Sequence, residues 1–130
     1  MTPHDDLRTF LISQVTSVTT SNCFVGPVRP VSAQIPHNSV FCLSTGGRAS
    51  DRVHSDLSEL RYPTVQIRVR HNTFSSGYTF VKEIYDALFN ANINGYWDIR
   101  LLQSEPVFIL QDENSNYHWS INVEMRYQTN

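Results

Sequence analysis

The run of residues 117–127 places the tightest constraint on the fold, because apolar and polar residues alternate along its whole length. Successive side chains of a β-strand point to opposite faces of a sheet, so this alternation predicts a strand with one buried face. A slip of one residue in its pairing would expose the large apolar side chains Trp119, Ile121, Val123 and Met125. The register of this strand is therefore strongly specified.

Several other segments have the pattern of strands. The stretch 62–71 contains a second alternating run, residues 65–70, which can supply a partner for 117–127 in one layer. Shorter strands are predicted at residues 22–25, 40–44, 97–103 and 107–111, and the prolines at 27 and 30 restrict a further strand at 28–31 to an edge of the sheet. The polar residues 112–116 have the length and composition of a hairpin turn.

Two segments have helical periodicity. The first opens with Thr2 as a candidate N-cap and Pro3 in the first turn, and its apolar face continues to Val18, where a β-branched run is expected to end it. The second is entered through residues 75–77. Its predicted apolar face consists of Tyr78, Val81, Ile84, Tyr85 and Leu88.

The order of these elements predicts the fold class. Strands in consecutive runs, rather than in strict alternation with helices, favour an α+β fold with a mainly antiparallel sheet. Two amphipathic helices can cover only one face of that sheet. The other face is polar, and it faces water or another subunit. The chain of 130 residues is expected to form a single domain.

Residues 45–61 form the longest stretch without apolar periodicity. A loop of this length inside a compact domain is uncommon, and such loops are functional or disordered. The stretch carries charges of both signs, among them Arg48, Asp51 and Arg52. It is predicted to be a long, mobile loop, and two interpretations remain open: a solvated loop, or a segment that docks a partner.

Composition excludes several classes of protein. The net charge is −2, whereas a nucleic-acid-binding protein is typically basic or carries a basic patch. No apolar run approaches the length of a membrane span, and the N-terminus does not resemble a secretory signal. The chain is therefore expected to stay in a cytoplasm, or to leave it by a route other than secretion. Cys23 and Cys42 lie in apolar surroundings and are expected to be buried free thiols.

The sequence contains no recognisable catalytic motif. A phosphate-binding loop is missing, and the five histidines have no spacing typical of a metal site. His118, Asp112 and Ser120 are the residue types of a hydrolytic triad, but Ser120 lies in the middle of a strand rather than on a sharp exposed turn. The chain is therefore predicted not to be an enzyme, and no cofactor or metal is expected.

Three segments together carry a resemblance to a known family. Residues 62–71 contain a Val-Gln-x-Arg-x-Arg strand, residues 76–88 contain an Ile-Tyr-Asp-x-Leu helix, and residues 105–123 end in a Ser-Ile-Asn strand. In this order and spacing, the chain resembles the minor capsid, or tail terminator, family of long-tailed bacteriophages. Residues 20–61 match that pattern weakly.

The resemblance implies a structural virion protein. Such proteins form a hexameric ring that caps the tail tube, stops its polymerisation and offers a surface for joining the head. The implied partners are other copies of the chain, the tail tube protein and a head–tail connector or head-closure protein, with genome DNA passing through the ring without sequence-specific binding. No membrane partner is implied. The implied location is the head–tail junction of the virion, after assembly in the host cytoplasm.

Two alternative functions remain open. A head-closure or adaptor protein of the same virion is the nearest one, because those proteins are also small ring-forming domains. A ligand-binding or catalytic α+β domain is the other. The candidate interface residues are Arg48, Asp51, Arg52, Arg68, Arg70 and Glu124. Arg68 and Arg70 are expected to form ion pairs between subunits, to pair with Glu124 across strands within one chain, or to lie in solvent.

Overall fold

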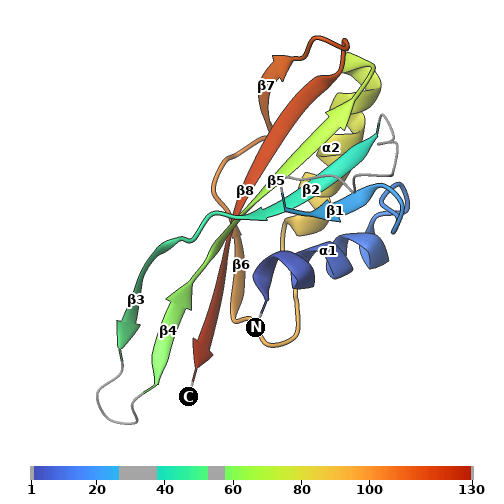
Figure 1. The fold of residues 1–130 in the computed structure, drawn as a ribbon. Coiled ribbons are helices and arrows are strands. Elements are labelled where there is room, and N and C mark those ends of the chain that lie inside the picture. The colour runs from blue at the N-terminus through green and yellow to red at the C-terminus, as the bar shows by residue number, and fades with distance from the viewer. Residues whose placement is uncertain (1, 27–37, 53–57, 130) are drawn as a thin grey trace.

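The computed structural model describes residues 2–26, 38–52 and 58–129. Its helices are α1 (Pro3–Gln14) and α2 (Phe74–Leu88) (Figure 1). Its strands are β1 (Cys23–Val25), β2 (Ser39–Ser44), β3 (Arg48–Arg52), β4 (Glu59–Tyr62), β5 (Thr64–His71), β6 (Asp98–Leu101), β7 (Val107–Gln111) and β8 (Tyr117–Thr129).

Strand β8 is the centre of the sheet, as its alternation predicts. Trp119 in β8 lies across from Val69 in β5 and also from Phe108 in β7, so β5 and β7 occupy opposite edges of β8. The strand order is β1-β2-β5-β8-β4-β3, with β6 and β7 also paired to β8. All pairs among these strands are antiparallel except β1 with β2. The α+β fold and the pairing of 62–71 with 117–127 are confirmed.

The two helices bury the apolar face of this sheet in a single core. Helix α1 packs against β1 and β2, and α2 packs against β5 and β8. Trp119, Ile121, Val123 and Met125 are all buried there, as predicted. Cys23 and Cys42 belong to the same core and are free thiols, which confirms that expectation.

Gly77 sets how closely α2 approaches the sheet. A Cβ at this position would lie 2.4 Å from the ring of Trp119, so only glycine permits the observed packing. The buried face of α2 is consequently centred on Gly77, Val81 and Ile84. Tyr78, which the sequence assigns to the apolar face, is instead 38% exposed because it lies one residue away from that centre. The prediction for Tyr78 is wrong.

Three runs of the chain continue past the core and form an arm. We define the arm as β3, β4 and residues 128–129 of β8, and the body as the remaining described residues. In the arm, β4 pairs with the end of β8, and β3 pairs with β4. Figure 1 shows the arm projecting away from both helices, at the opposite end of the molecule from β7.

A proline and a glycine shape the backbone at the junction between body and arm. Pro63 separates β4 from β5, and its carbonyl accepts a hydrogen bond from the amide of Met125 in β8 (2.8 Å). Gly47 has a φ of +104°, and a Cβ there would lie 2.1 Å from the carbonyl oxygen of Tyr62. Glycine is therefore required where β2 passes into β3, because two backbones meet there.

The arm corrects the prediction for residues 45–61. This stretch is not a loop without regular structure, because β3 and most of β4 lie within it. The sequence signal fails because all five residues of β3 are exposed, so no face is buried and no periodicity appears. Residues 53–57 lie outside the described part of the chain, and the predicted mobility of the stretch stays a prediction.

Other boundaries differ in smaller ways. Helix α1 ends at Gln14 rather than near Val18, although Val18 is still buried in the core. Thr2 accepts a backbone hydrogen bond from Asp6 but makes no side-chain cap. The strand expected over 62–71 is divided at Pro63. The edge strand considered at residues 28–31 lies outside the described residues.

Candidate interaction surfaces

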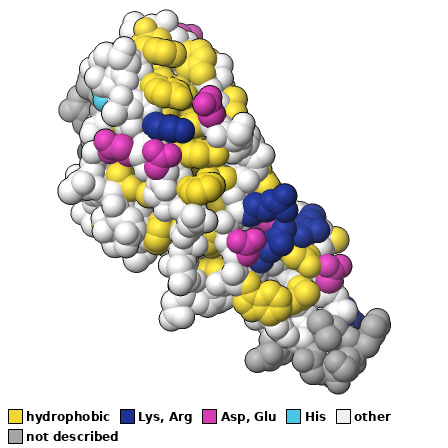
Figure 2. Space-filling view, turned by 180° about the vertical axis from the view of Figure 1, so that it is seen from behind, with side chains coloured by type: hydrophobic (Ala, Val, Ile, Leu, Met, Phe, Trp, Pro, Cys, Tyr) yellow, Lys and Arg dark blue, Asp and Glu magenta, His cyan; other side chains and the backbone are white. Residues whose placement is uncertain are grey.

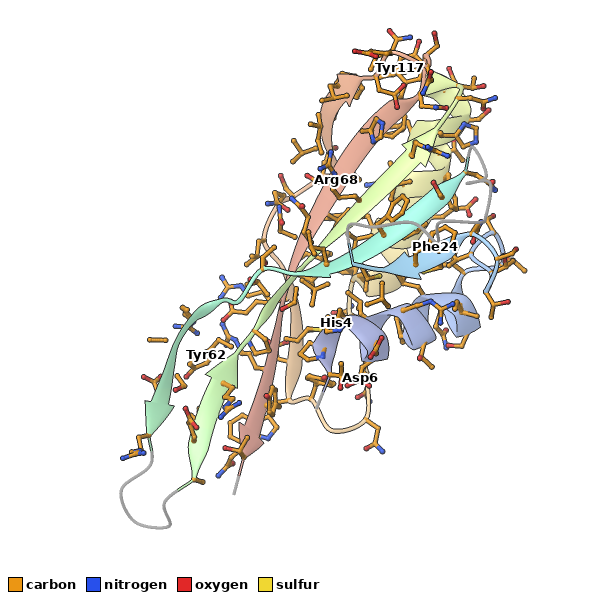
Figure 3. All side chains as sticks on the ribbon, viewed as in Figure 1. His4, Asp6, Phe24, Tyr62, Arg68 and Tyr117 are labelled. Carbon is orange, nitrogen blue, oxygen red and sulfur yellow. The ribbon has the colours of Figure 1, made fainter. Side chains whose placement is uncertain are left out.

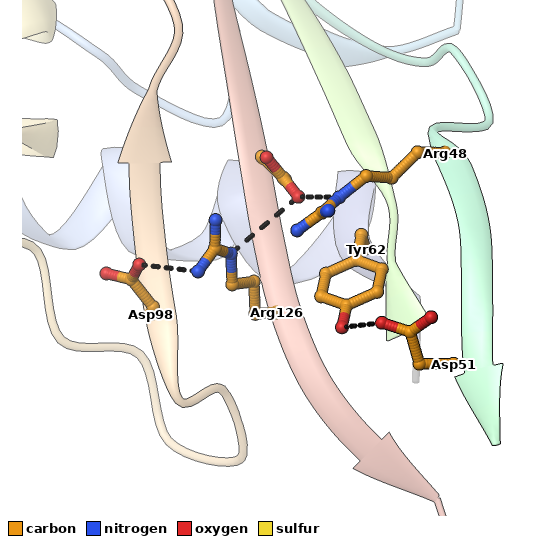
Figure 4. A network of polar contacts seen from close by, with 6 residues as sticks. Arg48, Asp51, Tyr62, Asp98 and Arg126 are labelled. Carbon is orange, nitrogen blue, oxygen red and sulfur yellow. Dashed lines mark hydrogen bonds and ion pairs between the residues drawn. The ribbon is translucent and has the colours of Figure 1, made fainter. Parts of the chain in front are cut away.

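A polar network joins the base of the arm to the body (Figure 4), and Glu124 of β8 is at its centre because it contacts both Arg48 and Arg126. The Glu124 side chain is only 9% exposed. Its Oε1 accepts a hydrogen bond from Arg48 Nε at 3.0 Å and lies 3.7 Å from Arg126 Nε. Arg126 also lies 3.9 Å from a carboxylate oxygen of Asp98 in β6. A nearly buried carboxylate is thus neutralised by two guanidinium groups, which makes its burial tolerable.

Tyr62 extends the network into the arm. The guanidinium carbon of Arg48 lies 3.7 Å from the centroid of the Tyr62 ring, a cation–π geometry. The Tyr62 hydroxyl donates a hydrogen bond to Asp51 at 2.6 Å. This bond raises the pKa of Tyr62, because the neighbouring carboxylate favours the protonated phenol. Strands β3, β4 and β8 are therefore linked by side chains as well as by backbone bonds.

The network corrects the predicted pairing of Glu124 with Arg68 and Arg70. Ser120 lies across from Arg68, and His118 lies across from Arg70. Glu124 instead lies across from Thr64, at the junction, where Arg48 of the arm reaches it. The sequence did not reveal this contact because it depends on how β2 continues into β3.

Ser120 and Glu124 also correct the predicted polar face, since both are buried although they lie on that side of β8. Strands on both edges of β8 bring long side chains beside these positions. Arg48 covers Glu124, and the short side chain of Ser120 lies between β5 and β7. The polar face is therefore less open along β8 than the alternation implies.

An open cleft occupies the sheet face that the helices leave uncovered. Its volume is about 270 Å³, and its lining combines Arg68, Arg70 and His118 with the apolar side chains of Phe41 and Leu43. Figure 3 shows Arg68 on this face, away from α1 and α2. Both arginines are partly exposed.

Strand β7 forms an apolar surface that sequence reasoning missed. The side chains of Val107, Phe108, Ile109 and Leu110 are between 39% and 45% exposed. Phe74, at the start of α2, is 48% exposed, and its ring packs against Phe108 at 5.5 Å between centroids. We call β7 together with Phe74 the β7 surface. In Figure 2, hydrophobic side chains run along the body, whereas basic side chains gather near the base of the arm.

The residues considered for catalysis form a structural contact instead. His118 Nε2 lies 2.8 Å from Asp112 Oδ2, and the backbone amides of Asn114 and Asn116 donate to Asp112 Oδ1. These bonds lower the pKa of Asp112 below its usual range, and the bond with His118 has the largest effect. Asp112 thereby organises the turn between β7 and β8. Ser120 is buried and lies on no exposed turn.

Within the described ranges, no cluster of three or more His, Cys, Asp or Glu side chains could hold a metal ion. Neither described helix is long and apolar enough to cross a membrane. The described residues present three features: a polar network that fixes an arm, a basic cleft, and an exposed apolar strand.

Comparison with known proteins identifies the family. The family model described as "Bacteriophage tail terminator protein" matches residues 28–129. A chain of the solved structure "Virion of native gene transfer agent (GTA) particle" superposes with a TM-score of 0.66, covering 97% of this chain and 94% of that chain at 12% identity. At this identity the likeness shows a shared fold. Curated protein sequences include no significant match. The chain belongs to the bacteriophage tail terminator family and is a structural, non-enzymatic protein of the virion tail.

Proposed function

We propose that this protein assembles into a hexameric ring that caps the tail tube, stops its polymerisation and offers a surface for joining the head. The family match over residues 28–129 carries this proposal. A tube polymer stops when the last ring reproduces the tube's contact on one side only. The tail tube protein would bind one face of the ring, and a head–tail connector or head-closure protein would bind the other.

A closed ring of identical subunits needs two different patches on each chain, one for each neighbour. The arm and the β7 surface lie at opposite ends of the molecule and differ in chemistry, which suits this requirement. The genome would pass through the lumen without sequence-specific contacts, in keeping with a net charge of −2.

Four of the candidate interface residues retain that proposed role. Arg68 and Arg70 border the basic cleft, and Arg52 and Asp51 lie exposed on β3. Arg48 and Glu124 hold the arm within one chain, so we propose that they act on assembly by positioning the arm. Charge reversal at Arg68 and Arg70 together tests the cleft: rings and tails of normal length would exclude it from the interface.

Deleting the gene from a phage that encodes this protein tests the function. We expect tails of irregular, excessive length that carry no heads, because nothing stops the tube. Supplying the intact protein from a plasmid should restore both tail length and head joining. Tails of normal length that still join heads would refute the proposal. Tails of normal length without heads would instead favour a head-closure protein.

A further inference from the structure

Strand β7 presents an open edge of the sheet. Among the residues that the structure describes, β7 pairs only with β8, so its outer backbone N–H and C=O groups face solvent. Exposed edges of this kind are usually guarded by Lys, Pro or an inward-pointing charge, because they readily pair with other strands. Pro106 precedes β7 and a bulge interrupts its pairing with β8, but the strand itself carries four consecutive large apolar residues, followed by Gln111.

The β7 surface extends beyond the strand itself. Phe74 packs edge-on against Phe108 and also against Tyr117, with centroids 5.5 and 5.4 Å apart. An added strand would therefore find backbone groups for pairing and an aromatic surface beside them. This combination is typical of strand addition, in which backbone bonds give affinity and side-chain contacts give specificity.

The arm offers a strand of the complementary kind. Strand β3 pairs only with β4 within the described ranges, and all five of its residues are exposed. No helix covers either face of the arm (Figure 1). Narrow ribbons of strands without such cover are marginally stable in water, so the arm gains more than the body from a covering partner.

We propose that β3 of one subunit adds to the open edge of β7 in the next copy of this chain. This inference rests on the ring described under Proposed function, and it names the contact that builds the ring. Both strands have five residues, so they match in length. Because the arm and β7 lie at opposite ends of the molecule, the contact runs head to tail around the ring.

The charges at the two strands favour the same contact. Strand β3 begins and ends with arginine, Arg48 and Arg52. Strand β7 is preceded by Glu105 and followed by Asp112 and Glu113, and residues 105–117 contain no Lys or Arg. Carboxylates therefore stand beside the arginines whether the strands pair parallel or antiparallel. Arg52 gains more from a carboxylate on the neighbouring subunit than Arg48 does, because Arg48 already contacts Glu124 within its own chain.

Disulfide trapping in assembled particles tests this contact. Ser50 and Ile109 are the central residues of β3 and β7, so they face each other in either orientation. Particles carrying the Ser50→Cys and Ile109→Cys variants on one chain should, after mild oxidation, yield a ladder of covalent oligomers up to the complete ring. Each single variant should yield only the background of the native chain, whose cysteines Cys23 and Cys42 are buried.

Electron microscopy of the same particles separates the possible failures. Rings without a ladder would overturn the β3–β7 contact and leave the proposed function standing. Particles without rings of this chain would overturn both.

A charge on the edge gives an independent test. Ile109→Lys is expected to weaken association of subunits at least about tenfold, since a buried charge without a partner opposes pairing. The matched control is Phe89→Lys, which alters a side chain 64% exposed at the far end of α2. Equal ring assembly by both variants, each with a native thermal melt, would also overturn the contact.

Discussion

Three runs of chain pass from the body into the arm, yet the two parts are stabilised in different ways. In the body, the strands place apolar side chains under two helices, and Trp119, Ile121 and Val123 are almost completely buried. In the arm, β3 is exposed throughout, and Glu124 and Arg48 hold its base. The body therefore has an apolar core of its own, whereas the arm is held at its junction within one chain.

The largest expected effect is in the body. Trp119→Ala removes the largest of the fully buried side chains and should lower the free energy of unfolding by about 3–5 kcal/mol. Chemical denaturation measures this loss. The control is Trp97→Ala, because Trp97 is 66% exposed and its removal should change stability little. Similar stability of the two variants would mean that the body is not held by this core.

A smaller effect is expected at the junction. Residue 47 has a positive φ, and Gly47→Ala places a methyl group against the backbone of Tyr62. The substitution should destabilise the folded arm by about 1–3 kcal/mol. Hydrogen exchange should show faster exchange in β3 and β4 with little change in the body. In the control Gly46→Ala, the added methyl group has no atom within 4 Å. This variant should lose only about 1 kcal/mol of stability, because residue 46 has a positive φ. Uniform destabilisation by Gly47→Ala would show that arm and body unfold as one unit.

The polar network at the base of the arm should contribute less. Glu124→Gln removes the charge shared by Arg48 and Arg126, and we expect a loss of about 1–2 kcal/mol because Arg48 is largely exposed. The loss should appear as faster exchange in the arm. Glu113→Gln, on an exposed turn, serves as the control. If exchange in the arm is unchanged by Glu124→Gln, the network does not hold it.

The smallest effect depends on pH and concerns the turn between β7 and β8. Bonds to Asp112 lower its pKa in the folded protein relative to the unfolded chain. Its contribution to stability is therefore present above the unfolded pKa, near about 4, and is lost as pH falls through the lower folded pKa. Asp112→Asn should thus be less stable than the native protein at pH 6, with the difference shrinking below about pH 4. Denaturation at several pH values would show it, and a difference independent of pH would contradict it.

The sequence predicted the body better than the arm, for a physical reason. Alternation in β8 and β5 directly reflects burial of one face, so the two strands and their pairing could be predicted. Strand β3 buries neither face, so its residues carry no such pattern. The contact of Glu124 with Arg48 depends on how the chain turns at Gly47, which periodicity does not encode.

The candidate surfaces show the same limit. Arg68 and Arg70 were predictable as residues on the uncovered face, because they alternate with buried neighbours in β5. Strand β7 was predictable as a strand, but its apolar run is also typical of a buried one. Its exposure follows from its position at the edge of β8, with no strand beyond it in the described residues. Only the assembled sheet reveals which apolar strand lacks a neighbour.

The most direct measurement of the central claim is a cryo-electron microscopy reconstruction of the intact particle with this chain located in it. We expect one ring of six copies at the end of the tail tube nearest the head, with the tube protein on one face and a head protein on the other. Each arm should contact the adjacent copy. Finding the chain elsewhere in the particle, or as isolated single copies, would contradict the account.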